Sequence, residues 1–128
     1  MPKKAMEILT ESMFYTLMAL SRNAMCGIDI AAYVEGKTRG RVLLGPATLY
    51  TILGKFEKEG LIEETAVSGR KRTYAITRNG LDAYHEELDR LRACILDAET
   101  PDDAFLAEPA PRQLPGDAMP APSLQRRE

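Results

Sequence analysis

The chain has 128 residues, of which 45% are hydrophobic, and its 17 Lys/Arg against 19 Asp/Glu give a formal net charge of −2. This length suits one domain of ordinary size with additional segments, and the 3 Phe and absence of Trp indicate a mostly aliphatic core. The two Cys and the single His belong to no C-x-x-C or Cys/His cluster, which argues against a metal site and against a disulfide framework. We therefore expect no cofactor.

The first twenty residues mix charged and apolar side chains, and they contain no apolar run long enough for a signal sequence or a membrane span. We expect a cytoplasmic protein without a membrane partner. The net charge is distributed unevenly. Residues 37–72 hold 8 Lys/Arg against 4 Asp/Glu, which gives +4, whereas residues 96–128 hold 3 against 7, which gives −4. A basic stretch inside an acidic chain is compatible with a polyanionic partner for the folded part.

The first half of the chain predicts two helices, at residues 11–22 and at about 26–38. Thr10 is a good N-cap for the first helix, and residues 23–25 form a short connection. Gly27, near the start of the second helix, either allows close packing or is merely tolerated there. The apolar run Val42–Leu44 is expected to pair as a short strand.

The stretch Leu44–Ile62 predicts one short helix, with residues typical of a helix start and a helix end at its two boundaries. The other predicted elements are described relative to this helix. Pro46 suits a first helical position, and Gly60 suits the position where a helix stops. Four apolar side chains recur between them at helical spacing: Leu49, Ile52, Leu53 and Phe56. The opposite face is small, rich in hydroxyl groups and lysine-bearing, which suits close approach to a polyanion.

Two strands are predicted after this helix, at residues 64–68 and 73–76, with residues 68–72 between them as the tip of a hairpin. Three helices followed by a basic two-stranded hairpin make a winged helix-turn-helix, a mainly α fold with a small β-hairpin (α+β). The cations of the tip are Arg70, Lys71 and Arg72. They form either a solvated turn or a set of phosphate contacts, and their place in the same domain as the basic helix favours phosphate.

A final helix is expected from Thr77 to about Asp97, with Thr77 as its N-cap. Its apolar residues repeat with a period of 3.5, which is typical of a coiled-coil seam: Leu81, Tyr84, Leu88, Leu91 and Ile95. This stripe packs either on its own domain or on a second copy of the chain. Its narrowness favours the second copy and hence a homodimer.

Beyond residue 100 the chain contains six of its eight prolines, which predicts a disordered tail by composition. The expected organisation is therefore a winged helix DNA-binding domain at 1–76, a C-terminal dimerisation helix at 77–97 and a Pro- and acid-rich tail at 98–128.

Five runs carry a family resemblance: Phe14-Tyr15-x-Leu-x-Ala-Leu, Cys26-Gly27-Ile28-Asp29-Ile30, Gly45-Pro46-Ala47-Thr48-Leu49-Tyr50-x-Ile-Leu, Phe56-Glu57-Lys58-Glu59-Gly60-Leu61-Ile62, and Arg70-Lys71-Arg72-x-Tyr74-x-Ile76-Thr77-x-x-Gly80. Over residues 9–95 these runs resemble the PadR family of bacterial transcriptional regulators, in its short branch with a single C-terminal helix.

The resemblance implies a repressor that binds a palindromic operator in double-stranded DNA as a homodimer, with the helix that opens at Pro46 in the major groove. It also implies release by a small hydrophobic or aromatic effector near the dimer interface. Multidrug-sensing members hold such ligands between tryptophans of the last helix. This chain has no Trp, so that pocket cannot be carried over.

The residues expected to contact DNA lie on the organising helix and the hairpin: Pro46, Ala47, Thr48, Tyr50, Thr51, Lys55, Arg70, Lys71 and Arg72. Those expected at the dimer interface are Phe14, Leu81, Tyr84, Leu88, Leu91 and Ile95. A winged helix can alternatively serve as a protein interaction module without a DNA role, against which the +4 of residues 37–72 argues. An enzyme is not expected, because the carboxylates around residues 57–64 have no partnering base or metal ligand.

Overall fold

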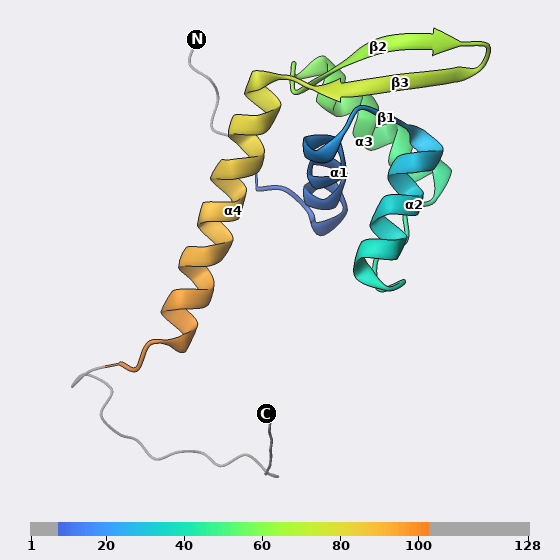
Figure 1. Ribbon diagram of the computed structural model, residues 1–128. Helices are drawn as coiled ribbons and strands as arrows, with labels where there is room; N and C mark the ends of the chain where they lie inside the picture. The colour runs from blue at the N-terminus through green and yellow to red at the C-terminus, as the bar shows by residue number, and fades with distance from the viewer. Residues whose placement is uncertain (1–7, 103–128) are drawn as a thin grey trace. The chain divides into compact units, whose positions relative to one another are not determined.

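The computed structural model describes residues 8–102 (Figure 1). Seven elements follow one another: α1 (Glu11–Arg22), β1 (Met25–Cys26), α2 (Gly27–Thr38), α3 (Pro46–Lys58), β2 (Ile62–Ser68), β3 (Lys71–Ile76) and α4 (Arg78–Glu99). The predicted winged helix fold is confirmed. The chain divides into two compact units, residues 1–93 and 94–128. The predicted tail from residue 103 onward lies outside the described residues.

Helix α1 begins where its cap predicts. The Thr10 hydroxyl accepts a hydrogen bond from the backbone N–H of Met13 at 3.1 Å, and the Glu11 carboxylate lies in the first turn, where the helix dipole favours a negative charge. Both features are set by the local sequence, and the helix ends at Arg22 as expected.

The sheet has three antiparallel strands in the order β1-β3-β2, of which the sequence predicts the two strands of the hairpin but not β1. The additional strand is Met25–Cys26, whose residues pair with Tyr74 and Thr73 of β3. The prediction of a strand at Val42–Leu44 is wrong.

The run Val42–Leu44 instead forms an irregular connection, in which the Val42 N–H donates to the Thr38 hydroxyl at 3.0 Å. Val42 and Leu44 are buried while Leu43 is 65% exposed. A loop with alternating burial therefore imitates the pattern of a strand.

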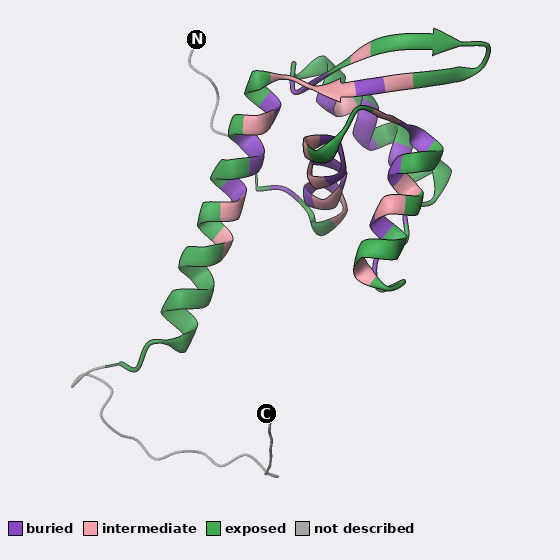
Figure 2. Ribbon diagram, viewed as in Figure 1, coloured by how far each residue is buried: buried purple, intermediate pink, exposed green. Residues whose placement is uncertain are grey.

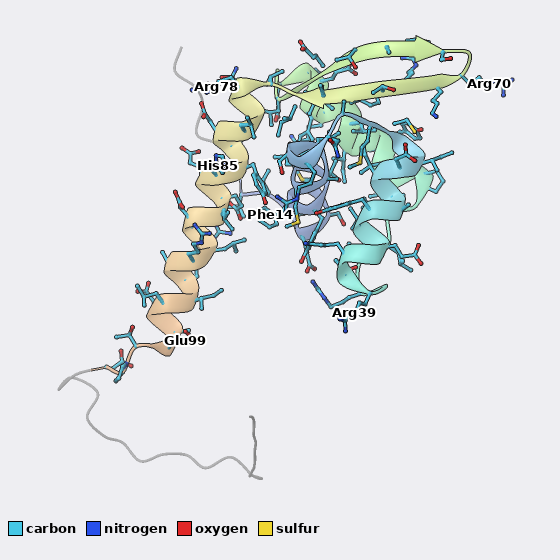
Figure 3. The ribbon with its side chains drawn as sticks, viewed as in Figure 1. Phe14, Arg39, Arg70, Arg78, His85 and Glu99 are labelled. Carbon is cyan, nitrogen blue, oxygen red and sulfur yellow. The ribbon has the colours of Figure 1, made fainter. Side chains whose placement is uncertain are left out.

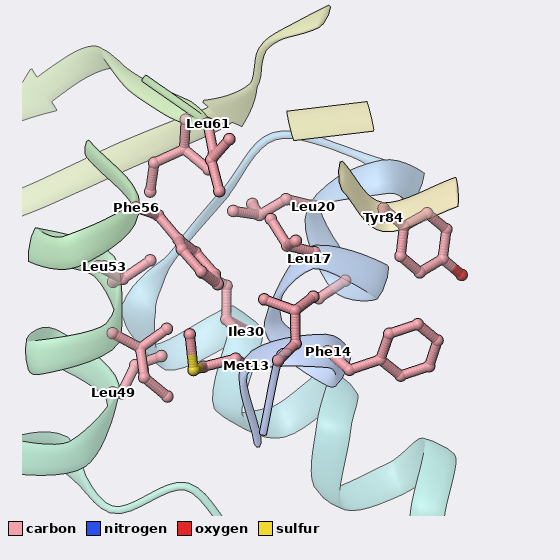
Figure 4. Packing of buried hydrophobic residues seen from close by; sticks show 14 of the residues in the cluster. Met13, Phe14, Leu17, Leu20, Ile30, Leu49, Leu53, Phe56, Leu61 and Tyr84 are labelled. Atoms are coloured by element: carbon pink, nitrogen blue, oxygen red, sulfur yellow. The ribbon is translucent and has the colours of Figure 1, made fainter. Parts of the chain in front are cut away.

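The core forms where the apolar faces of α1, α2 and α3 meet beneath the sheet. Figure 4 shows Leu17, Ile30 and Phe56, one from each helix, around a common centre, and all three are fully buried. Burial of each such side chain contributes about 1.5–3 kcal/mol to the free energy of unfolding. The four residues of the α3 stripe predicted from helical spacing are all buried, so that interpretation is confirmed.

The start of α4 is fixed against the junction between α3 and β2. The Thr77 hydroxyl donates to the carbonyl of Gly60 at 2.7 Å and accepts from the N–H of Gly80 at 3.1 Å, which makes Thr77 the expected cap. A Cβ added at Gly80 would lie only 2.1 Å from the backbone oxygen of Leu61. The close approach of these two backbone segments therefore requires glycine.

We expect Gly80→Ala to lower the free energy of unfolding by about 2 kcal/mol and the melting temperature by roughly 10 °C, because a backbone oxygen cannot easily move away. Gly36→Ala is the matched control, since Gly36 is also helical and a Cβ there would meet nothing within 4 Å. Thermal unfolding followed by circular dichroism measures both. Equal melting temperatures for the two variants would contradict the proposed close contact.

Candidate nucleic-acid interface

Helix α3 presents an N-terminus that no side chain caps. Its N-cap is Gly45, and Pro46 occupies the first turn, where the lost N–H has no intrahelical partner anyway. The first intrahelical hydrogen bond runs from the N–H of Leu49 to the carbonyl of Gly45 at 2.9 Å. The preceding free N–H groups and the helix dipole therefore favour an anion at this end.

The face of α3 opposite the core is exposed as predicted. All but one of the six α3 residues expected to contact DNA are exposed: Pro46, Ala47, Thr48, Tyr50 and Thr51. Lys55 is half-buried, and its ammonium forms an ion pair with the Glu59 carboxylate at 3.1 Å. The two ends of this face therefore differ, because hydroxyls dominate at the start and a paired lysine lies near the end.

Tyr50 joins α3 to the start of α2. Its side chain is 52% exposed, yet a Cβ added at Gly27 would lie 2.5 Å from its hydroxyl oxygen. Of the two readings of Gly27, close packing is therefore confirmed. The next residue, Ile28, is 78% exposed. The first turn of α2 thus adjoins the exposed face of α3, an extension that the sequence did not predict.

The hairpin of β2 and β3 turns more tightly than predicted. Ser68 pairs with Lys71, so only Gly69 and Arg70 form the tip, and Gly69 adopts a φ of 62° that favours glycine. Lys71 and Arg72 therefore belong to β3. Figure 3 shows Arg70 at the end of the hairpin, away from the helices.

The three hairpin cations have different surroundings, although all are exposed. Within the described residues Arg70 and Lys71 form no ion pair, whereas the Arg72 Nη1 lies 3.3 Å from the Glu64 Oε1. Both partners lie within residues 37–72, so the +4 counted there already includes this pair. Arg41 in the same stretch is paired too, and the Glu11 carboxylate at 2.6 Å raises its pKa.

The apolar stripe of α4 changes character along the helix, as Figure 2 shows. Tyr84 is buried and stacks on Phe14 of α1, with ring centroids 5.3 Å apart. Leu81, Leu88 and Leu91 are half-buried. In the second unit, Ile95 is 56% and Leu96 is 64% exposed.

Glu87 of α4 has a buried carboxylate, and its burial was not predicted from the sequence. Its side chain is 9% exposed and accepts two hydrogen bonds from Arg90, at 2.5 Å from Nη2 and 3.1 Å from Nε. Such bidentate pairing offsets the cost of removing the charge from water. The signal that predicts it is the i, i+3 spacing of Glu and Arg beside the apolar stripe.

A model of the PadR-like family of transcriptional regulators matches residues 16–86, more than half of the chain. The chain belongs to this family. The match covers α2, α3, the hairpin and the first turns of α4, together with most of α1. A comparison with curated protein sequences finds no significant match.

Several solved structures share the PadR-like fold. RosR of H. salinarum is 26% identical, with a TM-score of 0.57 over 74% of this chain and 82% of that one. A transcriptional regulator from Clostridium thermocellum is 22% identical, with a TM-score of 0.59 over 70% and 92% of the two chains. Bacillus subtilis PadR, solved in complex with operator DNA, is 19% identical, with a TM-score of 0.55 over 82% and 52%.

Among residues 8–102 of this PadR-like protein, no group of three or more His, Cys, Asp or Glu side chains could hold a metal ion. No helix in the same range is long and apolar enough to cross a membrane.

Proposed function

We propose that this PadR-like protein is a sequence-specific transcriptional repressor in the cytoplasm that binds double-stranded DNA through α3 and the hairpin. Three features together carry the proposal: the uncapped N-terminus of α3, the hydroxyl-bearing face beside it, and the hairpin cations Arg70 and Lys71, which form no ion pair within residues 8–102. Helix N–H groups and hydroxyls fix a protein on phosphates, and cations supply most of the sequence-independent affinity.

The base-reading capacity of α3 is limited, because Pro46–Lys58 contains no Arg, Asn or Gln for bidentate contact with guanine or adenine. Sequence preference then comes from hydroxyls, from contact of Ala47 or Thr48 with thymine methyls and from DNA shape. The exposed Ile28 at the start of α2 adds a second apolar side chain that can meet a thymine methyl.

Because one protomer can distinguish base pairs only weakly, we infer that two protomers bind together as a homodimer. Such a dimer binds a palindromic operator with half-sites about one helical turn apart. We place the dimer interface on α4. The half-buried Leu88 and Leu91 and the exposed Ile95 follow the predicted stripe. Phe14 and Tyr84 support this interface from within the protomer, because their rings stack on each other.

The proposal includes a small hydrophobic or aromatic effector near α4, on the ground of the family alone. Tyr84 is a poor candidate for stacking on such a compound, because its ring is 6% exposed and stacks on Phe14. The DNA complex of Bacillus subtilis PadR supports the DNA role through the shared fold.

The competing proposal, a winged helix that binds another protein, differs in its response to DNA. We expect the purified protein to protect an inverted repeat in duplexes taken from the region upstream of its own gene, with two protomers bound per repeat. Nuclease protection and native mass spectrometry measure the two quantities. Protection of no fragment, together with no retention of random duplex at low salt, would favour the protein interaction module.

A further inference from the structure

The pairing of Arg72 with Glu64 is the feature of the hairpin that the proposed function does not explain. We propose that Glu64 restrains Arg72 and thereby lowers the affinity of the hairpin for the DNA backbone. The inference rests on the proposed function, because it assigns a positioning residue within the same DNA-binding surface.

Strand register places both side chains on the face of the hairpin that covers the helices. Ile62 and Tyr74 are buried and define this inner face. Glu64 lies directly opposite Tyr74, and Arg72 precedes Tyr74 by two residues on β3, so both share its face. Figure 1 shows α3 beneath the hairpin, on this side of the strands. Burial raises the pKa of the Tyr74 hydroxyl, and the nearby Glu57 of α3 acts in the same direction.

Lys71 projects from the opposite face of β3, because side chains alternate along a strand. Its partner in the ladder is Ser68, whereas Arg72 lies opposite Val67. The register shift between Glu64 and Ala66 lies in β2 beyond Glu64, so it changes neither the face of Glu64 nor the alternation along β3. Of the two β3 cations, only Arg72 is therefore on the same side as α3.

The geometry of the pair determines which partner is held. The Glu64 side chain is 25% exposed and the Arg72 side chain is 59% exposed, so the carboxylate is the more fixed of the two. A phosphate that approaches Arg72 from the α3 side must compete with a carboxylate that stays in place and repels it. Because phosphates are the same in every sequence, the restraint lowers the affinity for operator and random DNA by the same factor.

Glu64→Gln tests this restraint, and Glu63→Gln is its matched control. Glu63 lies opposite Ala75 on the other face, is exposed, and forms no ion pair within the described residues. We expect Glu64→Gln to tighten binding to a random-sequence duplex roughly fivefold more than Glu63→Gln does. The slope of log K against log salt is expected to steepen by up to about 0.9 per protomer.

The same two substitutions in an Arg72→Ala background separate the ion pair from general charge. There Glu64→Gln and Glu63→Gln are expected to have equal effects, because Arg72 is no longer present to be released. Equal effects in the unmodified protein, or an advantage of Glu64→Gln that persists without Arg72, would overturn the inference.

The shape of Gln matches that of Glu, and thermal melting verifies that each variant folds. If Glu64→Gln does not fold, Glu64→Ala removes the same carboxylate and the same comparison with Glu63→Ala applies. A parent protein that binds no duplex at all refutes the proposed function, whereas a parent that binds while both variants behave alike refutes only the restraint.

Discussion

Leu88→Asp is expected to convert the homodimer into a monomer and to abolish measurable operator binding. Leu88 is at the centre of the α4 stripe, and each protomer would bring one carboxylate into an apolar interface. An unpaired buried charge costs several kcal/mol, which is enough to dissociate a small dimer. Light scattering measures the mass of the particle, and fluorescence anisotropy measures the loss of DNA affinity, which we expect to exceed about a hundredfold.

Ala93→Asp is the matched control for this variant, because Ala93 is exposed and lies outside the stripe. Since Leu88 is half-buried against its own domain, circular dichroism must show that Leu88→Asp keeps its helices. Ile95→Asp serves as a second variant, as Ile95 is 56% exposed in the single chain. A dimer that persists in both Leu88→Asp and Ile95→Asp would move the interface to another surface.

The second large effect is expected from the hairpin cations. Changing Arg70, Lys71 and Arg72 together to Ala should weaken binding to all duplexes alike, by roughly a hundredfold to a thousandfold at about 100 mM salt. The phosphate contacts of Arg70 and Lys71 are lost in both protomers, together with the restrained contribution of Arg72. The salt slope should become shallower by about 0.9 for each lost contact. Anisotropy titrations at several salt concentrations measure both quantities.

A second triple variant, Lys37, Arg39 and Arg92 to Ala, removes the same charge from other places. Figure 3 shows Arg39 at the far end of α2 from the hairpin, and a 12-residue helix separates the two ends by about 18 Å. This control should retain most of its affinity. Equal losses in the two variants would mean that net charge, and not the hairpin, determines binding.

The elements that could be predicted from sequence are those whose signals are local. Pro46 and Gly60 mark the ends of the α3 segment, and Thr10 and Thr77 cap the helices that follow them, because each acts within a few residues of itself. The exposed face of α3 could be predicted for the same reason, since helical spacing alone separates it from Leu49 and the rest of the buried stripe.

The features that sequence reasoning missed depend on partners distant in the chain. Strand β1 has two residues, too few for a pattern, and exists because Met25 meets Tyr74 of β3. The contact of Tyr50 with Gly27 and the pairing of Arg72 with Glu64 likewise join different elements. The candidate site could thus be predicted as a list of exposed residues, but not its division into paired and unpaired cations.

Salt dependence of DNA binding by the unmodified protein tests the central claim most directly. We expect the homodimer to bind a random-sequence duplex of about 30 base pairs at ~50 mM salt. Its log K is expected to fall against log salt with a slope of roughly −3.5 or steeper, because Arg70 and Lys71 of the two protomers supply four phosphate contacts. The absence of binding at ~50 mM salt, or a slope near zero, would contradict the assignment of α3 and the hairpin as a DNA-binding surface.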